Sequence, residues 1–268
     1  MSIMLEARHI SKIFQSGGVL RQGQVKKAVD DVSFQLNAGE TLAIVGESGS
    51  GKSTVARLMM RLLAPSEGEV LWKGEVVTQM SPRQLRPHRH HIQMVFQDPF
   101  ASLNPRMRIV DSVGEGLRVH APELKPAQRR DKVAAMLETC GLSADVMMRY
   151  PHQFSGGQRQ RIGIARALIV APEVLVLDEP VSALDVSVQA QILNLLKDIQ
   201  QQTGVAYVFI SHDLSVVRYI AERVLVMFQG KVVEAGAIAQ VFHQPQHPYT
   251  QDLLAARPVA HPSMRVSL

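Results

Sequence analysis

The chain has 268 residues, of which 46% are hydrophobic and 20% are charged, a composition that fits a globular fold and excludes a disordered chain. Its formal net charge of +5 permits an acidic partner but identifies none. The single cysteine, Cys140, excludes an internal disulfide and a multi-cysteine metal cluster, which favours a reducing compartment. No apolar run is long enough to span a membrane, and the first residues lack the apolar region of a signal peptide, so we expect a cytoplasmic protein.

The first part of the chain predicts an antiparallel β pair. An apolar run near the N-terminus is followed by residues 15–27, which are rich in glycine and basic residues. Residues 28–36 then alternate apolar and polar positions, as a half-buried strand does. We therefore expect Gly17 and Gly18 to lie in the loop that joins two antiparallel strands.

Strands and helices alternate in the rest of the chain, around a helical insertion. Residues 101–154 are polar with broken apolar stripes, and one helix is expected over residues 126–140, ending at Gly141. On either side, the alternation predicts a mostly parallel sheet covered on both faces. The expected strands are residues 41–45, 92–96, 174–177 and 206–210, and the expected helices are residues 53–63, 155–170 and 188–202.

This pattern predicts one α/β domain with an antiparallel β subdomain and an inserted α-helical subdomain. We expect residues 1–97 and 156–240 to form the core and residues 98–155 the insertion. Residues 241–268 are expected to form a C-terminal tail, loosely packed beyond Gln244.

A glycine-rich segment between a predicted strand and a predicted helix matches the phosphate-loop pattern G-x-x-x-x-G-K-[ST]. In such a loop, backbone N–H groups and the helix N-terminus surround phosphate oxygens, while Lys52 reaches the β- and γ-phosphates and Ser53 binds Mg²⁺. A chance glycine-rich turn is the alternative, and the strand and helix on either side disfavour it. The predicted nucleotide-binding residues are Gly46, Glu47, Ser48, Gly49, Ser50, Gly51, Lys52, Ser53 and Thr54.

Two carboxylates, Asp178 and Glu179, follow an apolar strand at the edge of the sheet where ligands bind in α/β proteins. Asp178 is expected to hold Mg²⁺ through water. Glu179 is the candidate general base, because the neighbouring charge raises its proton affinity. Alone, the pair could be a solvated strand end, but the phosphate loop in the same chain favours catalysis.

Gln97 and His212 follow two other strands, and Pro99 is expected to begin a loop after the first. His212 can hydrogen-bond the γ-phosphate or the attacking water, and the Gln97 amide can contact water and Mg²⁺. Either residue alone is more often an ordinary surface side chain.

A second helix start carries glycines that a simple cap does not require. Ser155 and Gln158 have the spacing of a capping box, while Gly156 and Gly157 each cost about 1 kcal/mol against alanine in a helix. Glycines leave the N–H groups of the first turn accessible to an anion. We therefore expect a second phosphate-binding helix end.

These motifs together resemble those of ATP-binding-cassette ATPases, in order and spacing and over nearly the whole chain. The signature motif begins with Phe154, where leucine is commoner in the family. The resemblance implies that Phe14 stacks on adenine and that Asp185 belongs to the nucleotide-binding set. The matches to the Walker A, Q-loop, signature, Walker B, D-loop and H-switch motifs are residues 46–53, Gln97, residues 154–158, residues 177–180, residues 182–185 and His212.

Within that family the chain is most similar to the ATPase subunits of peptide and nickel importers. The local matches are residues 96–106 and the late His247, Pro248, Tyr249, Thr250, Leu253 and Leu254. The resemblance implies a heteromeric importer with a second, different but homologous ATPase subunit, two integral-membrane permeases and an external substrate-binding protein, and no nucleic acid. It also implies a peripheral position on the cytoplasmic face of the inner membrane.

The same resemblance implies that two ATP molecules lie head to tail between two such subunits, with Ser155 of one completing the site whose lysine loop belongs to the other. Many peptide-importer relatives have a cysteine-rich C-terminal extension that resembles an iron–sulfur site. No cysteine follows Cys140 here, so we expect no iron–sulfur cluster. A peptide, nickel or a metallophore stays open as the transported ligand.

Two rival functions are weaker. A soluble ATP-binding-cassette protein of chromosome maintenance or translation would add long coiled coils or a second cassette, which 268 residues do not hold. A small-molecule kinase with a phosphate loop would leave residues 155–158 and 182–185 unexplained.

Residues 83–91 form the densest run of arginine and histidine. Three histidines make a metal site conceivable, but Pro87 and the lack of nearby carboxylates or cysteines disfavour regular ligand spacing. A solvated basic face near membrane headgroups is the favoured interpretation.

Overall fold

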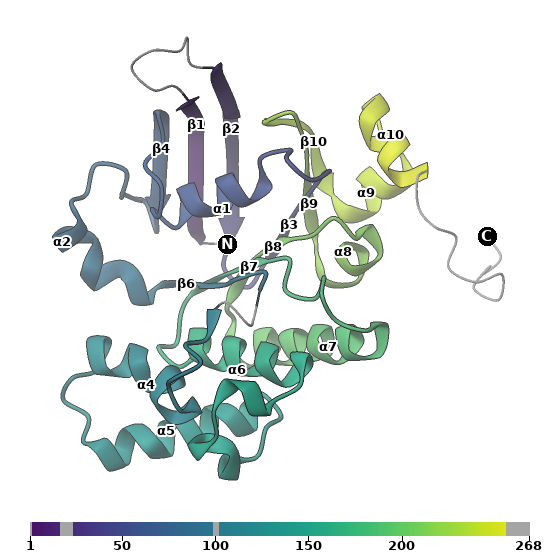
Figure 1. The fold of residues 1–268 in the computed structure, drawn as a ribbon. Coiled ribbons are helices and arrows are strands. Elements are labelled where there is room, and N and C mark those ends of the chain that lie inside the picture. Colours follow the sequence, from purple (N-terminus) through teal and green to yellow (C-terminus); the bar gives the residue numbers. More distant parts are fainter. Residues whose placement is uncertain (1, 17–23, 99–101, 256–268) are drawn as a thin grey trace.

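The computed structural model describes residues 2–16, 24–98 and 102–255, and two β-sheets carry its architecture (Figure 1). Within the described residues the larger sheet has six strands, of which only β10 runs antiparallel to its neighbour. The predicted mostly parallel sheet is confirmed. In spatial order its strands are β10 (Lys231–Ala237), β9 (Arg223–Phe228), β3 (Thr41–Val45), β8 (Ala206–Ile210), β7 (Val174–Asp178) and β6 (Ile92–Val95).

The smaller sheet is antiparallel and contains the N-terminal β pair that the sequence predicts. Gly17 and Gly18 of the expected connecting loop lie outside the described residues, as does Pro99. The strand order is β2 (Gln24–Asn37), β1 (Ile3–Ser16), β4 (Glu67–Trp72) and β5 (Glu75–Val76).

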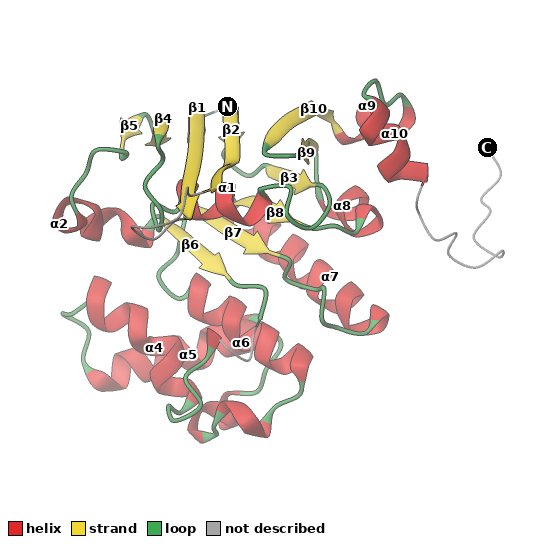
Figure 2. Ribbon diagram, turned by 45° about the horizontal axis from the view of Figure 1, so that its top comes forward, coloured by secondary structure: helices red, strands yellow, loops and turns green. Residues whose placement is uncertain are grey.

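Helices cover the larger sheet and form a separate group below it in both views (Figures 1 and 2). That group, α4 and α5, is inserted between β6 and β7, and α5 ends at Thr139, beside the predicted stop at Gly141. The helices are α1 (Lys52–Met59), α2 (Pro82–Leu85), α4 (Ile109–His120), α5 (Pro126–Thr139), α6 (Gly156–Leu168), α7 (Val186–Thr203), α8 (Leu214–Ile220), α9 (Ile238–His243) and α10 (Pro248–Ala255), with short 3-10 helices at Arg86–His90, Ala144–Met148 and Pro151–Gln153.

The strands of the larger sheet are apolar on both faces because each face has its own core. In β7, Val176 packs into the cluster that lies towards the smaller sheet, while Leu175 and Leu177 pack into the cluster shared with the helices. Helix α1 contacts β1, β2 and β7, so it joins the two sheets. Full burial of such an aliphatic side chain contributes about 1.5–3 kcal/mol, which explains the continuous apolar runs.

The expectation of a loose chain beyond Gln244 is wrong for residues 248–255, which form α10. Tyr249, Leu253 and Leu254 pack against the core. The Glu234 carboxylate accepts hydrogen bonds from the backbone N–H groups of residues 246 and 247, at 2.9 and 3.1 Å, and so fixes the connection to α10. No proline or histidine count in the sequence reveals such a contact between distant segments.

None of the helices in the described part of the chain combines the length and apolar character needed to cross a membrane.

Candidate functional site

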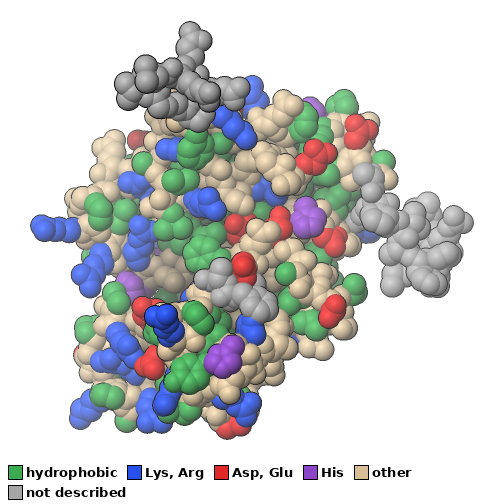
Figure 3. Space-filling model, viewed as in Figure 1, with side chains coloured by type: hydrophobic (Ala, Val, Ile, Leu, Met, Phe, Trp, Pro, Cys, Tyr) green, Lys and Arg blue, Asp and Glu red, His purple; other side chains and the backbone are tan. Residues whose placement is uncertain are grey.

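The parallel strands bring the predicted site residues to one edge of the larger sheet. Asp178 at the end of β7 lies opposite Ile210 at the end of β8, and Ile210 in turn lies opposite Ile44 of β3. The chain therefore leaves these strands at one edge, and the segments that follow them meet there. On the face seen in Figure 3, acidic side chains gather near the centre beside a histidine, between the sheets and the helical group.

The loop between β3 and α1 takes a conformation that requires glycine. Gly46 and Gly51 have φ angles of 145° and 108°. A Cβ on Gly46 would lie 2.2 Å from the Met227 carbonyl oxygen, and one on Gly51 would lie 2.5 Å from that of Ala28. The loop backbone is therefore pressed against β9 and β2, and only glycine allows that approach.

Lys52 is 5% exposed and its ammonium lies inside the loop. Its Nζ donates to the carbonyl oxygens of Gly46 and Glu47 at 2.7 and 2.8 Å, which uses two of three N–H groups and leaves one for a ligand. Burial lowers the pKa of Lys52, while the carboxylates of Glu179, Asp178 and Glu47 act in the opposite direction.

Ser53 and Asp178 bring two oxygen ligands together next to Lys52. The Ser53 hydroxyl donates to Asp178 Oδ1 at 3.1 Å. Burial raises the pKa of Asp178, the hydrogen bond from Ser53 opposes that rise, and the charge of Glu179 adds to it. A hydroxyl and a carboxylate are the hard oxygen ligands that Mg²⁺ prefers, so this pair fits a magnesium ion.

Glu179 is held by the two other predicted strand-end residues. Gln97 Nε2 donates to Glu179 Oε2 at 3.0 Å, and His212 Nδ1 lies 3.2 Å from Oε1. The Glu179 side chain is 16% exposed and that of His212 is 59% exposed, so the carboxylate is more shielded from solvent than the imidazole. The Glu179 φ of 47° is unusual for a residue other than glycine.

A cavity of about 490 Å³ lies between the phosphate loop and the side chains of Gln97 and Glu179, while Asp178 and His212 are not among its lining residues. Phe14 lines the cavity together with the phosphate loop. The adenine-stacking role that the resemblance implies for Phe14 stays a prediction. The buried hydroxyl of Ser50, within this loop, has no hydrogen-bond partner among the described residues. Two cations that the sequence reading missed, Lys26 and Arg57, also line the cavity, which therefore fits a polyphosphate. The full lining is Phe14, Lys26, Ala28, Ser48, Gly49, Gly51, Lys52, Ser53, Thr54, Arg57, Gln97 and Glu179.

Tyr249 is a further residue at the loop that sequence reasoning did not assign to the site. Its hydroxyl accepts a hydrogen bond from the Glu47 backbone N–H at 2.9 Å, and its ring lies 4.2 Å from that of Phe228. Tyr249 belongs to the segment that carried the importer resemblance, which was the only signal available. Helix α10 thus supports the phosphate loop from outside.

The second predicted phosphate-binding helix end lies apart from this cavity. Ser155 Oγ accepts from the Gln158 N–H at 3.3 Å, and Gln158 Oε1 accepts from the Ser155 N–H at 3.0 Å, so the capping box is confirmed. Ser155, Gln158 and Asp185 are exposed, and none of the residues that line the nucleotide cavity comes from residues 155–158 or 185.

The structure shows why position 157 is a glycine, which the sequence did not reveal. A Cβ on Gly157 would lie 2.5 Å from Val188 Cγ1 of α7, whereas one on Gly156 would meet Leu184 Cδ2 at 3.4 Å. Gly157 therefore allows α6 and α7 to pack closely. Packing explains one of the two glycines, in addition to the anion binding that we predict from both.

The arginine and histidine run is not a uniform solvated face. Arg83 and Arg86 are exposed, but Arg89 donates to the carbonyl oxygens of Met60 and Arg61, at 2.5 and 3.2 Å, at the end of α1. The histidines at 88, 90 and 91 are half-buried and contact one another. Within the described residues, no group of three or more histidine, cysteine or acidic side chains has an arrangement that holds a metal ion.

Comparison with known proteins gives a family and close relatives. A family profile described as "ABC transporter" matches residues 29–182. The chain is 49% identical to the oligopeptide transport ATP-binding protein OppF of Haemophilus influenzae over 266 residues, which cover 98% of this chain and 80% of the relative. It is 52% identical to the dipeptide transport ATP-binding protein DppF of the same organism over 248 residues, 92% of this chain and 76% of the relative.

A solved structure has the same fold. The dimeric ATP-binding cassette MJ0796, in a post-hydrolysis state bound to ADP and Pi, superimposes with a TM-score of 0.79 at 29% identity, covering 88% of this chain and 99% of that one. Because the match covers 88% of this chain, it is not confined to the phosphate loop.

Proposed function

Since this chain belongs to the ABC transporter family of ATP-hydrolysing proteins, we propose that it is the ATPase subunit of an importer of di- or oligopeptides. The names of the OppF and DppF relatives support peptides as the transported class and favour them over nickel. The observation that carries the hydrolytic role is the Glu179 carboxylate, held between Gln97 and His212 next to Asp178.

ATP binds in the 490 Å³ cavity, with its phosphates in the loop of residues 46–54. The N–H groups of the first turn of α1 and the ammonium of Lys52 hold the phosphate oxygens. Phe14 stacks on adenine. Lys26 and Arg57 add positive charge along the phosphate chain.

Ser53, Asp178 through water and the Gln97 amide oxygen would hold magnesium. When bound, the ion supplies positive charge that offsets the charge developing on the phosphate oxygens. The Ser53–Asp178 hydrogen bond orients both ligands beforehand. Asp178 has to be ionised for this role, which is the state that its burial disfavours.

Glu179 orients and deprotonates the water that attacks the γ-phosphate. Both of its carboxylate oxygens have a partner, so the side chain is held in one orientation. His212 is exposed enough to contact the γ-phosphate itself, and loss of that contact distinguishes the ADP state from the ATP state.

The chain works as one of a pair with a second, homologous ATPase. The edge that meets the nucleotide of the partner subunit includes the exposed residues Ser155, Gln158 and Asp185. The half-buried Gly156 and Gly157 belong to the same edge. ATP then joins the two subunits, and hydrolysis removes the phosphate that the partner holds. Closing and opening follow from this difference in affinity.

Two permeases and an external binding protein complete the importer, which places the chain on the cytoplasmic face of the inner membrane. The chain divides into a core of residues 1–97 and 156–240, an insertion of residues 98–155 and a C-terminal segment of residues 241–268. The insertion makes the contact with the permease. An exposed Phe96 next to Gln97 supports a contact there. This arrangement links the permease to the residue that holds Glu179.

The test is Glu179→Gln in the assembled transporter. We expect ATP binding to be kept and steady-state hydrolysis to fall by about a hundredfold or more, because the amide cannot accept the proton. The matched control, Glu138→Gln on the exposed side of α5, should leave both unchanged. Hydrolysis near the unmodified rate in the Glu179→Gln protein would overturn the assignment.

A further inference from the structure

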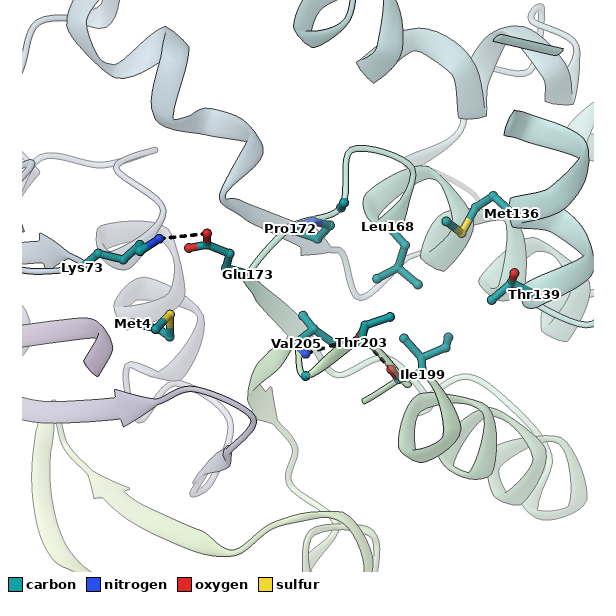
Figure 4. Close-up of a pocket in the computed structure, with 12 residues that line it drawn as sticks. Met4, Lys73, Met136, Thr139, Leu168, Pro172, Glu173, Ile199, Thr203 and Val205 are labelled. Atoms are coloured by element: carbon teal, nitrogen blue, oxygen red, sulfur yellow. Dashed lines mark hydrogen bonds and ion pairs between the residues drawn. The ribbon is translucent and has the colours of Figure 1, made fainter. Parts of the chain in front are cut away.

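A second cavity, of about 440 Å³, lies at the opposite edge of the larger sheet (Figure 4). Pro172 and Glu173 line it just before β7 begins, and Thr203 and Val205 line it just before β8 begins. These are the amino ends of the two strands whose carboxyl ends carry the nucleotide site. The cavity is therefore distinct from the site already described.

Three parts of the chain meet at this cavity. Met4 comes from β1 of the smaller sheet and Lys73 from the turn between its strands β4 and β5. Met136 and Thr139 come from α5 of the insertion, and the remaining residues come from the core. Its volume lies in the range of roughly 300–1,000 Å³ that small-molecule sites occupy.

Most of the lining is apolar. The threonine hydroxyls do not change this, because each donates to its own helix: Thr139 to the Ala135 carbonyl oxygen at 2.9 Å and Thr203 to that of Ile199 at 2.7 Å. The large apolar side chains are Met4, Met136, Leu168, Pro172, Ile199 and Val205.

One ion pair supplies the remaining polar side chains of the lining. Lys73 Nζ lies 2.9 Å from Glu173 Oε1, and His91 Nδ1 lies 3.5 Å from the same oxygen. Glu173 Oε2 is buried without a hydrogen-bond partner among the described residues. The ammonium has three N–H groups, so both members of the pair have bonding capacity left.

We propose that this cavity binds a small zwitterion with an apolar body, of the class of an apolar dipeptide. The ligand carboxylate pairs with Lys73, the ligand ammonium with Glu173, and the apolar side chains enter the space between α5 and the core. A zwitterion adds a partner of opposite charge to each member of the pair, whereas a ligand with one charge adds a partner to only one of them and an uncharged ligand to neither. None of these residues belongs to the nucleotide site. Dipeptide binding here is therefore tested independently of the proposed transport function.

The experiment is calorimetric titration of the full chain with leucyl-leucine, its N-acetyl form and its C-terminal amide. We expect leucyl-leucine to bind and each capped form to bind about tenfold more weakly, because each lacks one charge-assisted contact. Equal binding of all three forms, or no binding of leucyl-leucine up to millimolar concentration, would overturn the proposal.

Two variants test whether Lys73 binds the ligand carboxylate and Glu173 binds the ligand ammonium. With Lys73→Gln, the dipeptide and its amide should bind equally, while the N-acetyl form stays weaker. With Glu173→Gln, the dipeptide and its N-acetyl form should bind equally. A reversed or absent pattern contradicts the assigned orientation.

A filling variant tests the location. Met136→Trp should abolish dipeptide binding and leave ATP binding unchanged, whereas Ala135→Trp, on the neighbouring exposed position of α5, should leave both unchanged. Dipeptide binding that survives in a folded Met136→Trp protein places the ligand elsewhere. If that variant does not fold, the capped dipeptides on the unmodified chain still decide the question.

Discussion

Two buried charges, on Lys52 and Asp178, lie side by side at the nucleotide site. Burial lowers the pKa of Lys52 and raises that of Asp178, so in each case it disfavours the charged form that phosphate or metal binding needs. Opposite charges and the Ser53 hydroxyl offset part of this cost. The two buried charges therefore lower the free energy of unfolding of the nucleotide-free chain, and they are kept because nucleotide binding needs them.

The raised pKa of Asp178 predicts how the stability of the chain changes with pH. Because its pKa is raised above the usual 3.8, the folded chain holds this proton more readily than the unfolded chain, and stability falls as pH rises from that value through the raised pKa. Asp178→Asn is expected to stabilise the nucleotide-free chain at neutral pH by on the order of 1 kcal/mol. Thermal unfolding between about pH 4 and about pH 8 measures this. The gain should shrink towards the acid end, and a lower midpoint at neutral pH would contradict the assignment.

A single hydroxyl connects the C-terminal helix to the phosphate loop. Tyr249→Phe removes the acceptor of the Glu47 N–H, and water replaces it at this exposed position. We expect ATP affinity to fall by about twofold to fivefold, with little change in stability. Tyr219→Phe, which removes a hydroxyl that bonds Asn194 on α7, is the control and should leave ATP affinity unchanged. Equal affinities in the two variants would show that Tyr249 does not support the loop.

At the scale of elements, the packing of α6 on α7 decides what the signature glycines do. Gly157→Ala brings a Cβ into Val188 and should destabilise the chain by about 1–3 kcal/mol, since core overpacking has that cost. Gly156→Ala meets only an ordinary contact and should be neutral or stabilising by up to about 1 kcal/mol. Urea unfolding of both variants measures the difference.

Adding Val188→Ala to Gly157→Ala should restore most of the lost stability, because the two side chains then share the space. A double variant as unstable as Gly157→Ala alone would mean that the clash is not the cause.

At the scale of the whole molecule, the exposed edge at Ser155 has a function only in a pair of subunits. Ser155→Arg is expected to leave ATP affinity of the isolated chain unchanged, because Ser155 does not line its own cavity. Hydrolysis in the assembled complex should fall by more than about tenfold, at the site whose lysine loop belongs to the partner.

The control for added charge is Gln201→Arg, at the exposed far end of α7. Weakened ATP binding by the isolated Ser155→Arg chain, with closure of the complex preserved, would mean that Ser155 serves its own loop. The head-to-tail arrangement would then be wrong.

By itself the sequence determined the features that depend on short range: the phosphate loop at residues 46–53, the strand that ends in Asp178 and Glu179, the capping box at Ser155 and the alternation of strands and helices. These follow from residue type and spacing over a few positions. The order of strands across the sheet, and hence the meeting of Gln97, Glu179 and His212, came from the sheet register.

Only the tertiary structure decided which distant segments touch. Tyr249 contacts Glu47 across 202 positions, Val188 explains Gly157, and Arg89 caps α1. A cavity of about 440 Å³ lies where three parts of the chain meet. Each of these depends on packing between elements that are separate in sequence. Composition and periodicity report which face of an element is buried and not what it is buried against.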